Sequence, residues 1–495
     1  MINGDIIQIG KLIDKSYEEK NEKALYDCIS SAESIRDNCN TPEDLAVLEY
    51  YIGNAWADLD KIRSSTSQGL WAYNRNEHIN AIKSFRRCVS TNNISDHIRK
   101  NIFLQAYTNL GNMFSVSGRI IYAIECWKNA LEIEPTFGMA GCNYGHGLIY
   151  YASYLYDTNH EALVLRHAYR LLRTYSSQPN IPKEAQTVFD SGVEAIKKKL
   201  GESFLSKRNE FKKYSLGKTD QEKSYKKWVL DNGLFLNPLN DLFFDTAIAH
   251  DVTLLPSMLV RDFSAPVFQG FYNQIKQEYL TARYLFYCYE HELSGAGIHF
   301  SDKGRCLVDT FDYPQYGFRY EQLKNSFKML YSLFDKIGYF LNEYLRLGKD
   351  KNKVYFKNVW YRNNQIDPNI EELNNNPLRG LYFLSKDLFS NDGKDMEYLE
   401  VADPDAKRIY DLRNNLEHKY CKIHWFKLDE TEGDLCNDTL AFSVTEFELS
   451  EKTFRLLRYV REAVIYLSLS VHVEEKKLHK NVEVAIPLFL SDYDN

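Results

Sequence analysis

Three side chains near the end of one amphipathic pattern have the types and the spacing that phosphodiester chemistry needs. They are Arg413, Asn414 and His418, in the stretch Leu412–Tyr420, which reads LRNNLEHKY. Asn414 and His418 stand four residues apart, so in a helix they share one face, and the long side chain of Arg413 can reach the same side. An arginine can hold two nonbridging phosphate oxygens in a forked contact, and a histidine can move protons near neutral pH. The amide can donate to the phosphate or orient the histidine. Because RNA carries its own nucleophile, the 2′-OH, this set requires no metal.

Four long amphipathic patterns in the C-terminal half must position these residues, because apolar residues recur along them at helical spacing. Asp403 followed by Pro404 is typical of a helix start, with the Asp as N-cap and the Pro in the first turn. The patterns predict a four-helix bundle. They extend from Phe268 to Phe286, from Leu323 to Tyr344, from Asp403 through Leu416, and from Ser450, with apolar positions Phe454 to Leu467.

Two stretches interrupt the bundle pattern. Residues 352–376 are rich in Asn, and residues 420–449 contain alternating apolar residues on both sides of a polar turn, at Ile423 and Trp425 and then at Leu440, Phe442 and Val444. Alternation around a turn is typical of a β-hairpin. We therefore expect a small β-hairpin insertion between the third and fourth bundle helices.

The motif and its setting resemble the HEPN superfamily, whose motif is Arg, a polar residue, three variable positions and His. The resemblance covers roughly residues 265–473, and weakly 225–241. It implies that Arg413 and His418 are catalytic, that Asn414 is the polar helper, and that no cofactor takes part. The family's cut leaves a 2′,3′-cyclic phosphate and a 5′-hydroxyl. Since active HEPN domains usually pair two motifs in a shared cleft and this chain has one motif, the resemblance also implies a homodimer.

Other roles for the motif residues remain open at this point. Arg413 can instead pair with Glu417 or Asp411, and His418 can cap the helix, as in HEPN domains that only dimerise or bind ligands. Tyr420 completes a His-x-Tyr extension like that of some HEPN toxins, in which a partner nucleotidyltransferase modifies the tyrosine. Tyr420 is thus either a regulatory modification site or a residue that packs on the bundle, and we favour packing.

The N-terminal third resembles a stack of tetratricopeptide (TPR) repeats. In residues 104–136, small and large residues fall where that repeat has them, so that two antiparallel helices approach closely and large side chains fill the holes. Related patterns begin near Tyr50 and Tyr144, which gives the three units that such a stack needs. TPR stacks usually present a concave face to a protein or peptide, and the alternative is a stack that packs only against its own C-terminal domain. The pattern residues are Tyr107, Leu110, Gly111, Phe114, Ala123, Trp127, Ala130 and Pro135.

These patterns divide the chain into a TPR-like domain at 1–200, a connector at 201–264 and a HEPN domain at 265–495. A lysine-rich stretch from Lys197 to Lys227 begins just before the connector and extends into it, and we expect it to be helical. It either guides RNA or is a solvated helix face, and we favour the solvated face. Residues 228–242 are apolar, with Asn, Gly and Pro between, and we expect them to form an ordered loop held in the core.

The amino-acid composition of the chain excludes several classes of protein. The chain has 495 residues, 14% aromatics and only 12 Pro and 24 Gly, which favours long helices over a turn-rich β fold. A net charge of −7 excludes a protein that coats nucleic acid through its overall charge. Nine scattered Cys without a CxxC pair indicate reduced thiols and no zinc cage. With no run of 18 apolar residues and no signal-peptide pattern at the start, we expect no membrane span and a cytoplasmic location.

Weaker candidate sites accompany the motif. Glu290, His291 and Glu292 form a trio that could bind a metal, but no second cluster at ligand spacing supports them. His424 in the expected hairpin faces either the cleft or solvent. Asp309, Asp312 and Tyr313 are candidates for lining the site. No nucleotide-binding loop or serine nucleophile elbow occurs.

The sequence thus predicts an all-α protein that acts as a metal-independent endoribonuclease on RNA. We expect a toxin or anti-phage effector whose activity the TPR-like domain controls. The alternatives are a non-catalytic TPR/HEPN adaptor that dimerises and binds protein partners, and a HEPN domain that binds a nucleotide-like signal.

Overall fold

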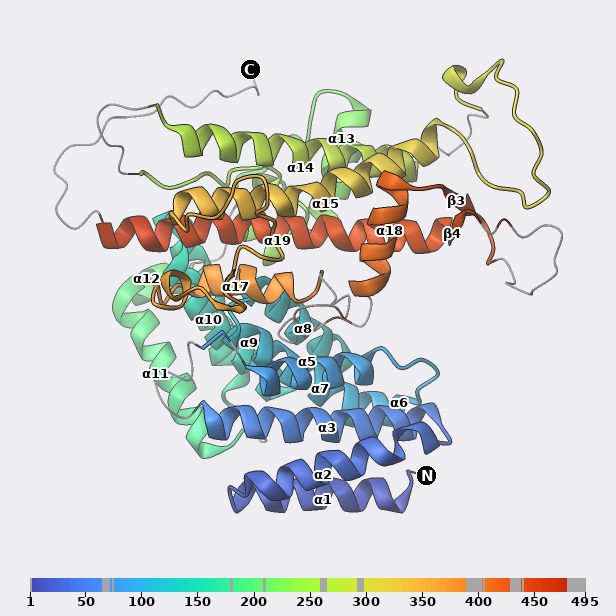
Figure 1. The fold of residues 1–495 in the computed structure, drawn as a ribbon. Coiled ribbons are helices and arrows are strands. Elements are labelled where there is room, and N and C mark those ends of the chain that lie inside the picture. The colour runs from blue at the N-terminus through green and yellow to red at the C-terminus, as the bar shows by residue number, and fades with distance from the viewer. Residues whose placement is uncertain are drawn as a thin grey trace.

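The computed structural model describes residues 2–64, 72–73, 75–178, 181–207, 211–258, 265–291, 298–388, 403, 406–427, 438 and 440–478. Helices dominate these residues, and two short strand pairs accompany them. Figure 1 shows the N-terminal helices stacked below the long helix α19, with α14 and α15 above it. The predicted all-helical fold class is therefore confirmed. In the residues that the structure describes, no helix is both long and apolar enough to cross a bilayer.

In the N-terminal half, each helix packs mainly against its neighbours in chain order, from α1 to α11. The π-helical turn η2 joins α6 to α7, so these three form one continuous rod. The helices are α1 Gly4–Glu18, α2 Glu22–Ile35, the 3-10 turn η1 Arg36–Asn38, α3 Pro42–Arg63, α5 Asn76–Val89, α6 Asp96–Ile98, η2 Arg99–Phe103, α7 Leu104–Val116, α8 Ile120–Ile133, α9 Gly138–Tyr154, α10 Thr158–Tyr175 and α11 Lys183–Leu200.

Glycines on one helix meet rings on the next. A Cβ on Gly111 of α7 would lie 2.5 Å from the indole nitrogen of Trp127 on α8, and a Cβ on Gly53 of α3 would lie 2.6 Å from the ring of Phe85 on α5. The predicted fit of small residues against large ones is confirmed at these two contacts. The assignment of the helix pairs to the TPR family stays a prediction.

The connector contains less helix than the lysine-rich pattern predicts. After α12 Glu202–Leu205, the described residues 211–219 are not helical, and α13 begins only at Asp220 and ends at Asp231. The prediction of one basic helical region is therefore wrong. Several of its lysines pair with acids on the same helix, for example Lys197 with Glu194 at 3.0 Å and Lys226 with Glu222 at 3.2 Å, as expected of a solvated face.

The loop after α13 is held in the core, as predicted. It contains two 3-10 turns, η3 Pro238–Asp241 and η4 Thr246–Ile248. Leu234 and Leu236 are buried completely. The Arg461 guanidinium on α19 donates to the backbone oxygens of Phe235 and Asn237 at 2.7 and 3.0 Å. The loop thereby contacts the longest helix of the bundle.

Among its described residues, the C-terminal half contains the four predicted bundle helices and a further helix of ten residues that was not predicted. The four are α14 Val267–His291, α15 Phe318–Tyr344, α18 Ala406–His418 and α19 Glu446–Leu478. α19 therefore begins before Ser450, and Pro404 of the expected helix start lies outside the described residues. The additional helix, α17 Asn376–Ser385, packs against α19. Asn375 caps α17 by accepting from the backbone N–H of Leu378 at 3.0 Å, and Pro377 stands in its first turn. Two short turns, η5 Phe300–Asp302 and α16 Pro368–Glu371, complete the helical part.

The strands differ from the predicted hairpin. β3 Cys421–His424 and β4 Phe442–Thr445 occur in the expected insertion, but they pair in parallel. A parallel pair cannot be joined by a tight turn, so this insertion is not a hairpin. A hairpin does occur within the Asn-rich stretch, between β1 Tyr361–Arg362 and β2 Gln365–Ile366. Its two turn residues, Asn363 and Asn364, have the positive φ angles of 52° and 61° that such two-residue turns require.

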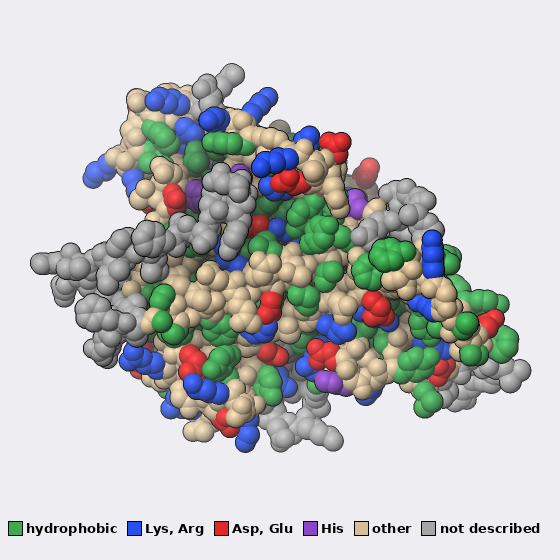
Figure 2. Space-filling view, turned by 90° about the horizontal axis from the view of Figure 1, so that it is seen from above, with side chains coloured by type: hydrophobic (Ala, Val, Ile, Leu, Met, Phe, Trp, Pro, Cys, Tyr) green, Lys and Arg blue, Asp and Glu red, His purple; other side chains and the backbone are tan. Residues whose placement is uncertain are grey.

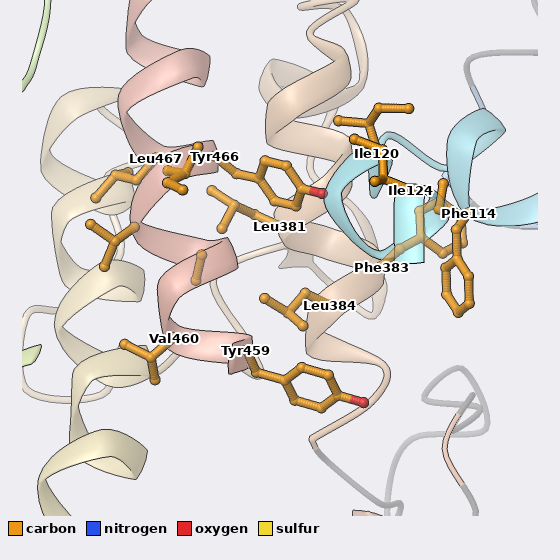
Figure 3. Close-up of a cluster of buried hydrophobic side chains, with 14 of the residues drawn as sticks. Phe114, Ile120, Ile124, Leu381, Phe383, Leu384, Tyr459, Val460, Tyr466 and Leu467 are labelled. Carbon is orange, nitrogen blue, oxygen red and sulfur yellow. The ribbon is translucent and has the colours of Figure 1, made fainter. Parts of the chain in front are cut away.

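The N-terminal helices and the bundle share one hydrophobic core. Figure 3 shows Ile120 and Ile124 of α8 facing Leu381 of α17 and Tyr466 of α19. The Tyr466 hydroxyl accepts from the backbone N–H of Ile121 at 2.9 Å, in the first turn of α8, where no helical carbonyl is available. The N-terminal stack therefore packs extensively against its own C-terminal domain, which is one of the two arrangements that the sequence allowed.

Candidate active site on helix α18

Helix α18 positions the motif by burying one face. Ala406, Ile409 and Leu412 are completely buried, and the helix packs against α15. This spacing leaves the residues that follow Leu412 at the edge of the contact. The Arg413 side chain is 27% exposed, and the His418 side chain, at the last residue of the helix, is 64% exposed. The motif residues are therefore accessible to a ligand.

Glu417 lies between two of the predicted site residues, Arg413 and His418. Arg413 donates from one Nη to the Asn414 side-chain oxygen at 3.0 Å, and its other Nη lies 3.0 Å from Glu417 Oε2. The same Glu417 oxygen lies 3.5 Å from His418 Nε2. The structure therefore brings Arg413, Asn414 and His418 together, with one carboxylate oxygen between the guanidinium and the imidazole. The sequence suggested Glu417 only as a competing partner for Arg413, and its place between both residues was missed.

The inner side of the Arg413 guanidinium faces α15. It lies 5.7 Å from the centre of the Tyr331 ring, a cation–π contact. Its Nε is buried and has no hydrogen-bond partner among the described residues. Burial raises the pKa of the nearby Asp335 carboxyl, while a backbone hydrogen bond from Phe356 and the charge of Arg413 act in the opposite direction. Tyr331 and Asp335 lie far from the motif in sequence, and no local pattern pointed to them.

Tyr420 lies just beyond the helix and is partly exposed, at 43%. Its backbone oxygen accepts from the N–H of Phe442 at 2.8 Å, and the Lys422 ammonium lies 5.5 Å from the centre of its ring. The Tyr420 hydroxyl also contributes, after burial, to raising the pKa of Tyr316. Tyr420 thus packs against the strand insertion while part of its ring faces solvent, and both of its proposed roles stay open.

A second polar cluster follows the motif on β3. Lys422 is buried and contacts the Asp312 and Asp438 carboxylates at 2.6 and 2.9 Å. Burial raises the pKa of Asp312, but hydrogen bonds from Lys422 and Thr310 outweigh it, so the net pKa is lowered. His424 is buried, 4.0 Å from the same Asp312 oxygen, so it faces neither solvent nor an open cleft. Neighbouring Tyr313 is exposed, and Asp309 accepts from the backbone N–H of Phe311 at 2.8 Å.

The structure does not support the trio Glu290, His291 and Glu292, at the end of α14, as a metal site. His291 stacks on Tyr287 at 4.1 Å between ring centres, and its Nδ1 lies 3.0 Å from the Tyr287 backbone oxygen. Glu292 lies outside the described residues. Within the described part of the chain, no three His, Cys, Asp or Glu side chains are grouped so that they could hold a metal ion.

Comparison with known protein families gives a match to the C-terminal helical bundle. The sequence model of the LA2681-like HEPN family matches residues 259–474, which include α14 to α18 and most of α19. No curated protein and no solved structure matches the chain significantly. The resemblance to the HEPN superfamily inferred from the motif is confirmed, and residues 259–474 form a HEPN domain of the LA2681-like family.

Proposed function

We propose that this HEPN domain is a metal-independent endoribonuclease. The observation that carries the proposal is the cluster at the accessible end of α18, in which Arg413 contacts Asn414 and one oxygen of Glu417 lies between Arg413 and His418. HEPN domains generally have RNA-related functions, and this grouping supplies a cation, an amide and a titratable base. These are the groups needed for transfer of a phosphodiester to its own 2′-oxygen.

In the proposed reaction, the 2′-oxygen attacks phosphorus while the bond from phosphorus to the 5′-oxygen breaks. The Arg413 guanidinium holds the nonbridging oxygens and stabilises the added negative charge. The His418 imidazole removes the proton from the 2′-OH, and the His418 imidazolium of a second copy donates its proton to the departing 5′-oxygen. The products are a 2′,3′-cyclic phosphate and a 5′-hydroxyl. The Glu417 carboxylate must move away from Arg413 before a phosphate can bind the guanidinium in its place.

The second copy enters the proposal because the chain contains one motif. Several large apolar side chains are exposed at the end of the molecule formed by β3, β4 and the segment before α15. Figure 2 shows hydrophobic side chains gathered at that end. Exposed apolar clusters of this kind mark interaction surfaces, and two members of this one, Trp425 and Phe426, follow the motif closely in the chain. Its members are Val308, Phe311, Tyr313, Trp425, Phe426, Leu440 and Phe447.

The proposal is tested by RNA cleavage in EDTA, with wild type, His418→Ala and Arg413→Ala. Each variant is expected to lose at least about 100-fold of the cleavage rate. Lys407→Ala, an exposed residue of the same helix, is the matched control and should cleave like wild type. The product ends are identified by mass spectrometry. Cleavage that survives in His418→Ala, or product without cyclic phosphate ends, would refute the proposal.

We further propose that the enzyme is a cytoplasmic toxin or anti-phage effector controlled by its N-terminal domain. Growth arrest on expression, absent in the Arg413→Ala/His418→Ala double variant, is the expected result. A second candidate function is a non-catalytic adaptor. It is favoured by the ion pair between Arg413 and Glu417, which neutralises the guanidinium without RNA. If the protein is an adaptor, wild type and the Arg413→Ala/His418→Ala double variant should have the same effect on growth.

A further inference from the structure

A cavity of about 810 Å³ lies between the N-terminal helices and the HEPN domain. Its walls come from η1, α3, α5, α7 and α8, and its far side from Arg455 of α19 and from Asp403, three residues before α18 begins. Figure 1 shows these N-terminal helices below α18 and α19. The volume is in the range of sites that hold small molecules. No part of the nuclease proposal uses this cavity.

The arginines of the cavity wall already have carboxylate partners. Arg86 donates to both oxygens of Asp387 at 2.6 and 2.7 Å, and Arg455 pairs with Asp403. Arg36 lies 2.8 Å from Glu49 Oε1, and Arg87 lies 3.8 Å from the same oxygen. An anionic ligand would have to displace these carboxylates. The wall arginines therefore offer no unpaired cation to an anionic ligand.

Among the carboxylates of the described wall, Glu49 is the one that lacks a full set of hydrogen-bond partners. Its side chain is 1% exposed, and its Oε2 accepts no hydrogen bond from the described residues. Burial raises the pKa of Glu49, against the opposing effects of Arg36, Arg87 and the Ser84 hydroxyl. A buried carboxylate oxygen without a donor is costly, so a ligand that supplies an ammonium or guanidinium group would relieve that cost. The partly buried Tyr107 and Tyr122 provide an apolar wall beside it.

We propose that this cavity binds a basic peptide segment of a partner protein, with a Lys or Arg side chain directed to Glu49, and that binding controls α18. The control passes through Asp403. Its carboxylate accepts from the Tyr459 hydroxyl at 3.1 Å and pairs with Arg455, which fixes the chain just before α18. A ligand that contacts Arg455 changes this anchor, and α18 carries Arg413 and His418. The regulatory part of the inference rests on the proposed nuclease function, whereas the binding part does not.

The binding part is tested with pools of acetylated hexapeptides in which one position is fixed as Lys, Arg, Asp or Glu. Full-length wild type should retain the Lys and Arg pools at least tenfold better than the acidic pools at 0.3 M salt. Glu49→Gln should reduce this preference to less than threefold. Glu132→Gln, an exposed glutamate of α8 outside the cavity, removes the same charge and should keep it. Ser90→Trp, at the exposed cavity rim, should abolish retention without touching the core.

The regulatory part is tested by amide hydrogen exchange of residues 406–418 with and without the best retained peptide. We expect the peptide to change the exchange rates of residues 406–418 at least threefold in wild type. In Ser90→Trp it should leave them unchanged. Equal retention of basic and acidic pools, or an unchanged preference in Glu49→Gln, would overturn the binding site whatever the RNA assays show. Binding with altered exchange but no RNA cleavage would overturn the proposed nuclease and leave the site intact.

Discussion

Arg119, the residue before α8, donates from Nε and Nη2 to the two carboxylate oxygens of Glu462 on α19, at 3.1 and 2.8 Å, and both side chains are buried. The remaining Nη of Arg119 contacts Asp387, which also pairs with Arg86. Two arginines and two carboxylates thus form one buried, electrically balanced network. It connects the N-terminal helices to α19 and to the turn after α17. The free-energy cost of burying these charges is offset only while each charge keeps its partner.

The charge balance of this network leads to a first prediction. Arg119→Met should lower the free energy of unfolding by about 3–5 kcal/mol, because it leaves Glu462 buried without a cation. Arg119→Met/Glu462→Leu should lose clearly less than the single variant, because Arg86 and Asp387 remain as a neutral pair. Urea unfolding measures both. A double variant as unstable as Arg119→Met, or worse, would show that the network is not organised by charge balance.

The close approach of two glycines gives a second prediction. A Cβ on Gly380 of α17 would lie 2.6 Å from the backbone oxygen of Gly118, which has φ of +85°. Because neither backbone can yield easily, Gly380→Ala should cost about 2 kcal/mol of stability. Gly270→Ala is the matched control, since Gly270 lies in α14 and its Cβ would meet no atom within 4 Å. That change should gain up to about 1 kcal/mol. Similar melting temperatures for the two variants would contradict the interface geometry.

The carboxylate between Arg413 and His418 gives a third prediction. Glu417→Gln removes the negative charge that competes with phosphate for the guanidinium, so RNA should bind several-fold more tightly. Binding is measured by fluorescence anisotropy in the His418→Ala background, which prevents cleavage. Glu451→Gln changes the net charge equally at an exposed position of α19 and should leave the affinity nearly unchanged. An equal gain in both variants would mean that only overall charge is involved.

A buried histidine gives a fourth prediction, for pH. His78 of α5 is fully buried with Nδ1 3.1 Å from Asp60 Oδ2, and burial lowers its pKa to about 4. In the unfolded chain this pKa is about 6.5, so below that pH the unfolded state binds a proton that the folded state excludes. Stability should therefore fall as the pH drops from 6.5 to 4, by up to about 1.4 kcal/mol per pH unit.

His78→Gln should flatten this dependence in urea unfolding measured between pH 7 and pH 5. Part of the dependence should remain, because burial also lowers the pKa of His167 to about 4. An unchanged slope in the variant would assign the acid sensitivity to other groups.

Much of the helical framework was predictable from local patterns. The apolar spacing that places Ile409 and Leu412 on one buried face of α18 is a property of consecutive residues, so it identified the helix and its orientation. The same holds for the pairing of small and large residues at Gly111 and Trp127. α17 was not predicted, although Asn375 and Pro377 form a recognisable helix start, because the Asn-rich stretch 352–376, which ends at its first residue, interrupts the bundle pattern.

The direction of the strand pair was not predictable. Alternation of apolar residues shows which face of a strand is buried, but it is the same for parallel and antiparallel neighbours. In this chain β3 pairs with β4 in parallel, and Gln315 donates to the backbone oxygen of Ile423 at 2.7 Å from a segment more than a hundred residues earlier. Contacts of this kind depend on where distant segments meet.

The sequence by itself determined the helix-rich fold, the HEPN resemblance and the clustering of Arg413, Asn414 and His418 on one helix end, because each depends on residues within a turn or two of each other. Only the tertiary structure decided that Tyr331 and Asp335 lie behind Arg413, that Arg119 neutralises Glu462, and that the stack covers one side of the bundle. These features require side chains tens to hundreds of residues apart to be desolvated together. Their partners are selected by the packing of whole helices, which no local spacing encodes.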